Sequence, residues 1–265
     1  MMPRDLWVGT SWKMNKTISQ SIDYAVTLRD RARDGRWDRL NPFIMPTYTA
    51  IGAVAAVLKE SSVQVGAQNA HWESSGAWTG EVSMSQVADA GGKLVEIGHA
   101  ERRRWFGETD EYVNMKVLAA IRCGLTPVVC IGESSDIHDN GKAADFVLKQ
   151  VTADLRDVSD QSQVLLAYEP EWAIGEEGRE LEPDDVSQVL EALSAAFDVR
   201  GTIVGGSVTI RTIDTLIGLP NLSGFFIGRA AWEVDSYCDI LEHVSELTSR
   251  IDDREESRWR VSETA

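Results

Sequence analysis

Residues 115–132 read MKVLAAIRCGLTPVVCIG, and this stretch contains the unit from which the fold can be predicted. Residues 115–123 suit a helix that stops at Gly124, because glycine ends helices in the left-handed conformation at little steric cost. Residues 126–132 are a nearly continuous apolar run, which is typical of a parallel strand covered on both faces. The stretch therefore indicates a helix followed by a buried parallel strand.

Apolar runs of this kind recur along the chain, with longer segments of helical character between them. The runs are LWVGTS from Leu6, FIMP from Phe43, VQVGAQ from Val63, KLVEIGH from Lys93, TPVVCIG from Thr126, QVLLAYEP from Gln163, TIVGGS from Thr202 and GFFIGR from Gly224. Residues 18–34 have apolar side chains near helical spacing, and Pro183 opens a segment with an acidic first turn. Strands and helices in alternation predict a (β/α)8 TIM barrel of eight parallel strands, formed as one domain by residues 1–251.

The alternative to a barrel is an open doubly wound sheet, which would need the strands to divide into two halves. It is disfavoured because no GxGxxG pattern follows the first run. Residues 252–265, DDREESRWRVSETA, are charged and lack a sustained apolar face, so we expect a flexible C-terminal tail.

The composition limits the partners of the protein. Its 265 residues have a formal net charge of -16, which argues against binding to nucleic acid or to an anionic membrane. No apolar run is long enough for a membrane span or a signal peptide. The cysteines Cys123, Cys130 and Cys238 lack metal-ligand spacing. We therefore expect a cytoplasmic protein that uses no metal ion and no organic cofactor.

Polar side chains follow the apolar runs where the predicted strands end. Ser11 and Lys13 follow the first run, His99 ends the fourth run, and Glu169 ends the sixth. The last two runs end in loops that contain Gly205, Gly206, Ser207, Gly228 and Arg229. Sites in (β/α)8 barrels lie at the C-terminal ends of the strands, so these residues are expected on one rim. Together they could bind a phosphate group and move protons.

Ordered motifs connect these strand ends to a known family. They are SWKMNK at 11–16, VGAQN at 65–69, WTGEVS at 78–83, GHAERR at 98–103, VVCIGE at 128–133, AYEPEWAIG at 167–175 and GGSV at 205–208. Each motif alone is a weak signal. In this order and at these strand ends, they make the chain resemble triosephosphate isomerase over roughly residues 5–250.

The resemblance implies a role for each catalytic candidate. Glu169 would remove a proton from the carbon beside a carbonyl group, and His99 would polarise the carbonyl and shuttle a proton between the two oxygens. Lys13 would supply positive charge to the enediolate and the phosphate. This family is the standard example of an active site that tunes the pKa of a histidine. Its imidazole acts in the neutral form beside a helix N-terminus, so a short helix is expected after His99. Glu101 and Arg102 are interpreted as an ion pair or as residues that orient the lysine.

The resemblance also implies how a small phosphorylated sugar would be bound. The groups expected to bind its phosphate are the backbone N–H groups after Gly205 and Gly206, together with Ser207, Gly228 and Arg229. Gly175 belongs to residues 170–180, which resemble the closing lid of the family. Closure of a lid excludes water and would protect the enediolate from loss of its phosphate.

The loop HWESSGAWTGE suggests an interface between subunits. It contains Trp72 and Trp78, and exposed tryptophans in a long loop are typical of a contact surface. In the family this loop inserts into a second subunit, and a threonine at the position of Thr79 reaches the partner's site. The resemblance therefore implies a homodimer that forms through the loop around residues 70–81.

Five positions depart from the usual family pattern. They are Ser11 for an asparagine, Ala100 for the serine of GHSERR, Glu171 for an apolar residue after the lid proline, Val204 for the tyrosine of YGGS, and Arg229 for a glycine. Serine is shorter than asparagine and leaves room near the substrate, and arginine adds a charge suited to phosphate. GTSWKMNKT at 9–17 and the GR-A-AW pattern at 228–232 resemble a paralogous branch, the erythrulose-phosphate isomerases.

Three functional hypotheses remain open from the sequence. The first is an isomerase of a tetrulose phosphate such as L-erythrulose 1-phosphate, which keeps the enediolate chemistry. The second is ordinary triosephosphate isomerase, which interconverts dihydroxyacetone phosphate and glyceraldehyde 3-phosphate. The third is a noncatalytic phosphate-binding barrel, and the presence of Lys13, His99 and Glu169 argues against it.

Overall fold

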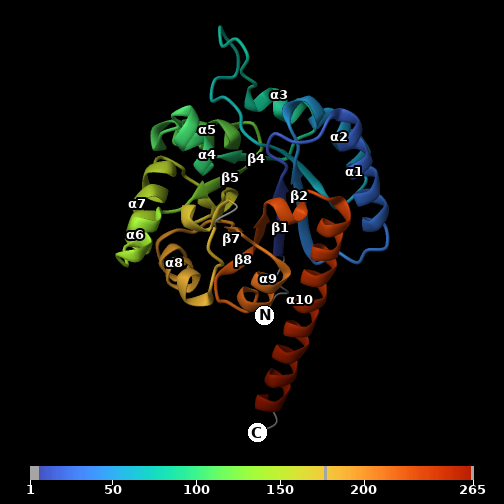
Figure 1. Cartoon of the computed structure of the whole chain (residues 1–265), viewed down its shortest axis with the longest axis vertical. Coiled ribbons are helices and arrows are strands. Elements are labelled where there is room, and N and C mark those ends of the chain that lie inside the picture. The colour runs from blue at the N-terminus through green and yellow to red at the C-terminus, as the bar shows by residue number, and fades with distance from the viewer. Residues whose placement is uncertain (1–5, 176–177, 264–265) are drawn as a thin grey trace.

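The computed structural model describes residues 6–175 and 178–263, and its centre is a closed barrel of parallel strands (Figure 1). The strands are β1 (Leu6–Ser11), β2 (Leu40–Met45), β3 (Gln64–Ala67), β4 (Leu94–Ile97), β5 (Thr126–Ile131), β6 (Leu165–Tyr168), β7 (Gly201–Gly206) and β8 (Leu222–Ile227). Each strand pairs with the next, and β8 pairs with β1. The predicted (β/α)8 barrel is confirmed, and the doubly wound sheet is excluded.

Helices follow every strand and cover the outside of the barrel (Figure 1). The α-helices are α1 (Ile18–Ala32), α2 (Ile51–Leu58), α3 (Met84–Asp89), α4 (Ala100–Phe106), α5 (Asp110–Arg122), α6 (Ser135–Asp139), α7 (Ala143–Asp154), α8 (Pro183–Ala196), α9 (Ile210–Leu216) and α10 (Val234–Glu263). The short 3₁₀ helices are η1 (Tyr48–Ala50), η2 (Gln161–Gln163), η3 (Glu171–Ala173) and η4 (Arg229–Ala231). In the described ranges no helix has both the length and the apolar character that crossing a membrane requires.

Local sequence signals explain where several helices begin and end. The Thr17 hydroxyl accepts a hydrogen bond from the backbone N–H of Gln20, whose side chain accepts one from the backbone N–H of Thr17. Pro183 opens α8, because its fixed φ angle suits a first turn. Gly124 follows α5 with a φ angle of 71°. The predicted helix start at Pro183 and the predicted stop at Gly124 are both confirmed.

The barrel interior is filled by side chains from alternate strand positions. This interior set is Phe43, Met45, Leu94, Val128, Cys130, Leu165, Ala167, Ile203 and Phe226. The rings of Phe43 and Phe226 stack with centroids 5.7 Å apart across the interior. The other buried apolar side chains, from strands and helices, form a larger core beneath the helices. Because the interior is packed, a ligand must bind at the mouth, where the strands end.

The last helix passes through the boundary that we expected after residue 251. α10 runs without a break from Val234 to Glu263, and Figure 1 shows its C-terminal part extending away from the barrel. Residues 264 and 265 lie outside the described part of the chain. A helical backbone does not measure motion, so the flexibility of residues 252–265 stays a prediction.

The seam between β1 and β8 depends on a glycine. Gly224 pairs with Trp7 across the seam and has a φ angle of 136°. A Cβ atom at this position would lie 1.8 Å from the backbone oxygen of Trp7. No side chain fits there without separating the two strands that close the ring.

We predict that Gly224→Ala lowers the free energy of unfolding by about 3 kcal/mol or more, because backbone strain and overpacking add. Urea denaturation followed by circular dichroism measures the change. Gly218→Ala is the matched control, since a Cβ there meets nothing within 4 Å, and it should change stability by less than about 0.5 kcal/mol. Equal stability of the two variants would contradict the role of Gly224 at the seam.

Candidate active site

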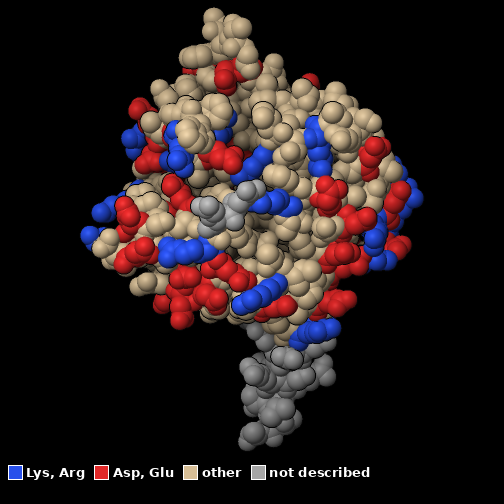
Figure 2. Space-filling view, viewed as in Figure 1, with Lys and Arg blue, Asp and Glu red and all other residues tan. Residues whose placement is uncertain are grey.

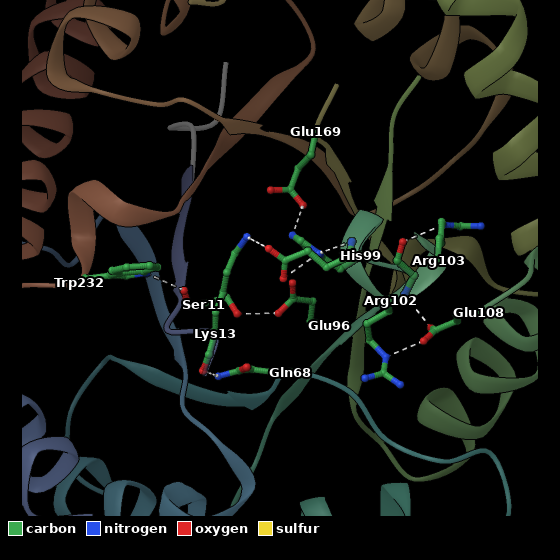
Figure 3. Close-up of polar contacts among 12 residues, drawn as sticks. Ser11, Lys13, Gln68, Glu96, His99, Arg102, Arg103, Glu108, Glu169 and Trp232 are labelled. Atoms are coloured by element: carbon green, nitrogen blue, oxygen red, sulfur yellow. Dashed lines mark hydrogen bonds and ion pairs between the residues drawn. The ribbon is translucent and has the colours of Figure 1, made fainter. Parts of the chain in front are cut away.

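The strand ends meet at one mouth of the barrel, and they hold the predicted catalytic residues. Ser11 ends β1, Lys13 lies in the loop after it, His99 follows β4 and Glu169 follows β6. Figure 3 shows these side chains pointing into the same space. A cavity of about 280 Å³ opens at the mouth, and Ser11, Lys13, His99 and Glu101 are among the residues that line it. The structure therefore brings together side chains that lie far apart in the sequence.

Lys13 is held in an uncommon backbone conformation. Its φ angle is 51°, in the left-handed region that few residues other than glycine adopt. The side-chain amide of Gln68 donates hydrogen bonds of 2.9 Å to the carbonyl oxygens of Lys13 and Met45, which fixes this turn. Lys13 Nζ lies 2.6 Å from Oε1 of Glu101, so Glu101 orients the lysine rather than pairing with Arg102. Although partial burial opposes it, the hydrogen bond from Lys13 lowers the pKa of Glu101.

His99 is the N-cap residue of α4, the short helix that was predicted to follow it. Its Nδ1 accepts a hydrogen bond of 3.1 Å from the backbone N–H of Glu101. A ring nitrogen that accepts a hydrogen bond carries no proton, so this contact assigns the neutral tautomer with hydrogen on Nε2. Nε2 lies 3.9 Å from Oε2 of Glu169 (Figure 3). The helix N-terminus therefore presents a neutral N–H donor to the cavity.

An ionic network fixes the corner between β4 and α4. The buried carboxylate of Glu108 accepts hydrogen bonds from the backbone N–H of Gly98 at 3.0 Å and from Nε of Arg102 at 2.6 Å. Arg103 donates to the carbonyl oxygen of Gly98 at 2.7 Å. Although burial opposes it, the positive charges of Lys116 and Arg102 lower the pKa of Glu108, which therefore stays ionised. The backbone beside His99 is therefore held through both the N–H and the carbonyl oxygen of Gly98.

Glu169 is 9% exposed and is packed against two glycines. A Cβ atom at Gly205 would lie 2.6 Å from Oε1 of Glu169, and one at Gly132 would lie 2.1 Å from its backbone oxygen. Oε2 of Glu169 is buried and has no hydrogen-bond partner among the described residues. The carboxylate oxygen that faces His99 is therefore free of competing hydrogen bonds among the described residues.

The phosphate-binding candidates lie on one side of the mouth. Gly206 ends β7 with a φ angle of 108°, and the hydroxyl of Ser207 donates a hydrogen bond of 2.7 Å to the carbonyl oxygen of Ala173. Gly228 follows β8, and Arg229 begins η4. Because β7 and β8 are neighbours in the barrel, the two glycine-bearing loops are brought together. A polypeptide backbone with glycines at these points can approach an anion closely.

Two further predicted residues lie apart from the cavity. In the lid stretch 170–180, residues 176 and 177 lie outside the described part of the chain, and the adjacent Gly175 is exposed with a φ angle of 97°. Thr79 is exposed in the loop between β3 and α3, which Figure 1 shows projecting from the barrel. Within the described residues, no contact joins Thr79 to the cavity of its own chain.

The surface around the mouth is mixed in charge although the chain is acidic. Figure 2 shows Lys and Arg side chains among acidic side chains on the face that carries the mouth. The net charge of -16 therefore does not make this face uniformly negative. Local positive charge at a cleft is what draws in a small anion, and the charge of the distant surface is screened by salt.

Several cavity residues were missed by sequence reasoning, and the most deeply buried of them is Glu96, which lies inside the apolar run of β4. Its side chain is 3% exposed, and it accepts a hydrogen bond of 2.8 Å from the hydroxyl of Ser11 (Figure 3). Burial, with the neighbouring Glu169 carboxylate, raises the pKa of Glu96 to about 7, against the opposing effect of the Ser11 hydrogen bond. The available signal was a glutamate on the same strand face as Leu94, a position that should be apolar.

Comparisons with known proteins agree with this fold. The sequence profile described as triosephosphate isomerase matches residues 6–244. L-erythrulose-1-phosphate isomerase of Mycolicibacterium smegmatis is 45% identical over 89% of the chain and 92% of that protein. The enzyme of the same name from Rhizobium etli is 45% identical over 96% and 98%. A crystal structure of triosephosphate isomerase from Bartonella henselae superposes with a TM-score of 0.78, at 26% identity, over 89% of this chain and 98% of that one.

A closed barrel of parallel strands with a cavity at its C-terminal mouth defines the molecule as a (β/α)8-barrel protein. The chain belongs to the triosephosphate isomerase family, and it is an isomerase. Among the described residues, no group of three or more His, Cys, Asp or Glu side chains is arranged to hold a metal ion.

We predict that replacing the Glu96 carboxyl changes how stability depends on pH. The folded pKa of about 7 exceeds the ordinary 4.5, so between these values the folded state keeps a proton that the unfolded state has lost. Stability therefore falls as pH rises through this window, by roughly 3 kcal/mol in total, and Glu96→Gln should remove that fall. Urea denaturation at pH 4.5 and pH 8 measures it in both proteins. Parallel pH profiles would contradict the assignment, since other buried carboxyl groups contribute equally to each protein.

Proposed function

We propose that this enzyme isomerises a four-carbon ketose phosphate, L-erythrulose 1-phosphate, by proton transfer through an enediolate. One observation carries the proposal: a buried, unpartnered carboxylate oxygen of Glu169, judged over the described residues, faces Nε2 of His99 at 3.9 Å. Lys13 and His99 both line the cavity at the mouth. A base, a neutral imidazole and a cation around one space supply what enolisation of a ketone requires.

The proposed steps follow from the structure of the substrate. L-Erythrulose 1-phosphate has a carbonyl on its second carbon and a hydrogen on its third. Glu169 takes that proton, and the electrons of the C–H bond form a double bond between the second and third carbons. Negative charge then develops on the carbonyl oxygen, where the His99 N–H and Lys13 stabilise it. After His99 has moved a proton between the oxygens, Glu169 returns its proton to the second carbon, and the carbonyl stands on the third.

The phosphate end of the substrate is assigned to the ends of β7 and β8. The proposed contacts are the backbone N–H groups after Gly205 and Gly206, together with Ser207, Gly228 and Arg229. The proximity of these two loops supports the assignment. In the same proposal Gly175 is a hinge of a lid that closes over the phosphate and excludes water. Its φ angle of 97° supports a position where the chain turns sharply.

The choice of a four-carbon substrate is supported by the relatives and by one departure from the family pattern. Relatives named L-erythrulose-1-phosphate isomerase are 42% to 46% identical to this chain, whereas the triosephosphate isomerase structure is 26% identical. Ser11, in the place of an asparagine, lines the cavity beside His99. The shorter side chain leaves volume that a longer sugar can use.

The proposal includes a homodimer in the cytoplasm. The projecting loop around residues 70–81 carries Trp78, which is 48% exposed, and Met14 and Phe106 near the cavity are 96% and 70% exposed. Large exposed apolar side chains around a mouth support a contact with a second copy of the chain. Thr79 would then reach the partner's cavity. All three cysteines are free thiols, which supports a reducing compartment.

The dimer is expected to sediment with twice the mass of the 29.3 kDa chain at micromolar concentration. Trp78→Glu should convert it to a monomer, because a charge would then have to be desolvated in the contact. Sedimentation-velocity ultracentrifugation measures both. Glu60→Gln, on an exposed loop elsewhere, is the control. A monomeric wild-type protein would contradict the proposal.

The substrate assignment is tested by kcat/KM for L-erythrulose 1-phosphate and for dihydroxyacetone phosphate, measured side by side by NMR. The value for the tetrulose phosphate should be at least about tenfold higher, because a difference of one group in a pocket corresponds to about 1–3 kcal/mol. A preference for the triose phosphate would identify an ordinary triosephosphate isomerase. Binding of phosphate without turnover of either compound would indicate a noncatalytic barrel.

The catalytic assignment needs a variant that moves the base without removing it. Glu169→Asp should lower kcat on the order of 100-fold, because it withdraws the carboxylate by about 1 Å, while inorganic phosphate still binds. Glu191→Asp, on the exposed face of α8, is the matched control. Unchanged turnover in Glu169→Asp would remove Glu169 from the proposed role.

A further inference from the structure

Glu96 occupies a position that the barrel would ordinarily give to an apolar side chain. It lies on β4 with the same orientation as Leu94, which belongs to the packed interior. Its carboxyl group is 3% exposed, so it has lost most of its contact with water. Burial of such a group is costly unless its polar atoms are satisfied, and an apolar residue of similar size would stabilise the barrel at least as well. Stability alone therefore gives no reason for a glutamate here.

The surroundings of Glu96 are those of a binding subsite. Its Oε2 accepts the hydrogen bond from Ser11, and both residues line the cavity together with His99 and Lys13 (Figure 3). Over the described residues, no hydrogen bond reaches the other carboxyl oxygen, Oε1. A hydroxyl group entering the cavity would find an acceptor in Glu96 and an exchangeable O–H in Ser11. This pair is therefore suited to an alcohol rather than to an anion, which the carboxyl would repel.

The barrel geometry places Glu96 across the mouth from the phosphate candidates, with Ser11 on β1 between them. The phosphate candidates end β7 and β8, and β4 lies on the opposite side of the closed ring from β8. A substrate anchored by its phosphate at β7 and β8 would thus extend its other end toward β4. The reacting carbons would lie between, where Glu169 and His99 face each other.

The chemistry of the substrates identifies which group would reach the pair. In dihydroxyacetone phosphate the carbon that loses the proton is the last carbon of the chain. In L-erythrulose 1-phosphate a hydroxymethyl group continues beyond that carbon. The additional group is small, neutral and able both to donate and to accept a hydrogen bond, which matches Glu96 and Ser11. A three-carbon substrate would leave the carboxyl unpaired in a closed site, and sites of this kind discriminate strongly against the shorter compound.

We propose that Glu96 and Ser11 form the specificity subsite that binds the terminal hydroxymethyl group of a four-carbon ketose phosphate. The proposal rests on the proposed function and adds to it the residues that distinguish four carbons from three. Glu96 acts here as a binding residue, which does not touch the atoms that exchange protons.

The test compares kcat/KM for L-erythrulose 1-phosphate and dihydroxyacetone phosphate in Glu96→Leu, Glu96→Gln and Ser11→Ala. In Glu96→Leu the ratio of the two values should fall roughly 10- to 100-fold, the loss expected when a hydrogen bond to an ionisable partner is removed. Ser11→Ala should shift the ratio in the same direction by a smaller factor. Glu96→Gln should retain part of the preference, because an amide can still bond a hydroxyl group.

Leu94→Val is the matched control, since it changes the packing of the same strand face without altering the cavity. It should leave the ratio unchanged while lowering the thermal midpoint slightly. Equal loss on both substrates in Glu96→Leu, Glu96→Gln and Ser11→Ala would overturn the inference and assign the pair a structural or catalytic role. A wild-type preference for dihydroxyacetone phosphate would instead overturn the proposed function, so the two failures are distinguishable. If Glu96→Leu does not fold, the other two variants still report the ratio.

Discussion

Closure of the barrel between β1 and β8 is the constraint on which the rest of the structure depends. The strands approach so closely that Gly224 faces the backbone of Trp7, and the ring of Phe43 lies where a side chain at Gly9 would be. The hydroxyl of Tyr237 on α10 lies 2.7 Å from the carbonyl oxygen of Val8 and 3.0 Å from that of Phe43, and its single O–H is shared between them, so the last helix is tied to the first two strands. Once the ring is closed, all parallel strands end at one mouth, and the candidate site exists only there.

The backbone at the mouth is held in place by hydrogen bonds from side chains. Gln68 fixes the turn at Lys13, and Glu108 fixes the corner that carries His99. Both devices use polar groups that are partly or wholly buried, and each is satisfied by hydrogen bonds. Proton transfer requires base and acid to remain within a fraction of an ångström of their working positions. The network that clamps the loops is therefore as much a part of the site as the side chains that meet in it.

Electrostatics at the mouth balances two opposing demands. Lys13 places a positive charge at the mouth, and Glu101 orients the ammonium group of this lysine. The interior of a barrel disfavours charge, and burial accordingly moves the Glu96 carboxyl toward its neutral form by raising its pKa to about 7. A neutral carboxyl is a hydrogen-bonding group without the repulsion that a full charge would exert on Glu169. Burial thus changes the chemistry of Glu96, while Glu169 keeps a buried oxygen without a hydrogen-bond partner among the described residues.

The sequence by itself determined the strands, the order of the barrel and the strand-end positions of Lys13, His99 and Glu169, because hydrophobic runs, turn glycines and ordered motifs are local signals. It marked Glu96 only as a glutamate at an apolar strand position and could not show what this side chain contacts, since Glu96 has no partner nearby in the sequence. Its partner Ser11 lies 85 residues earlier in the chain, and only ring closure brings the two together. For the same reason, the sequence did not show that Gln68 fixes the turn at Lys13. Burial and pairing across the mouth are properties of the closed ring, so only the tertiary structure decided them.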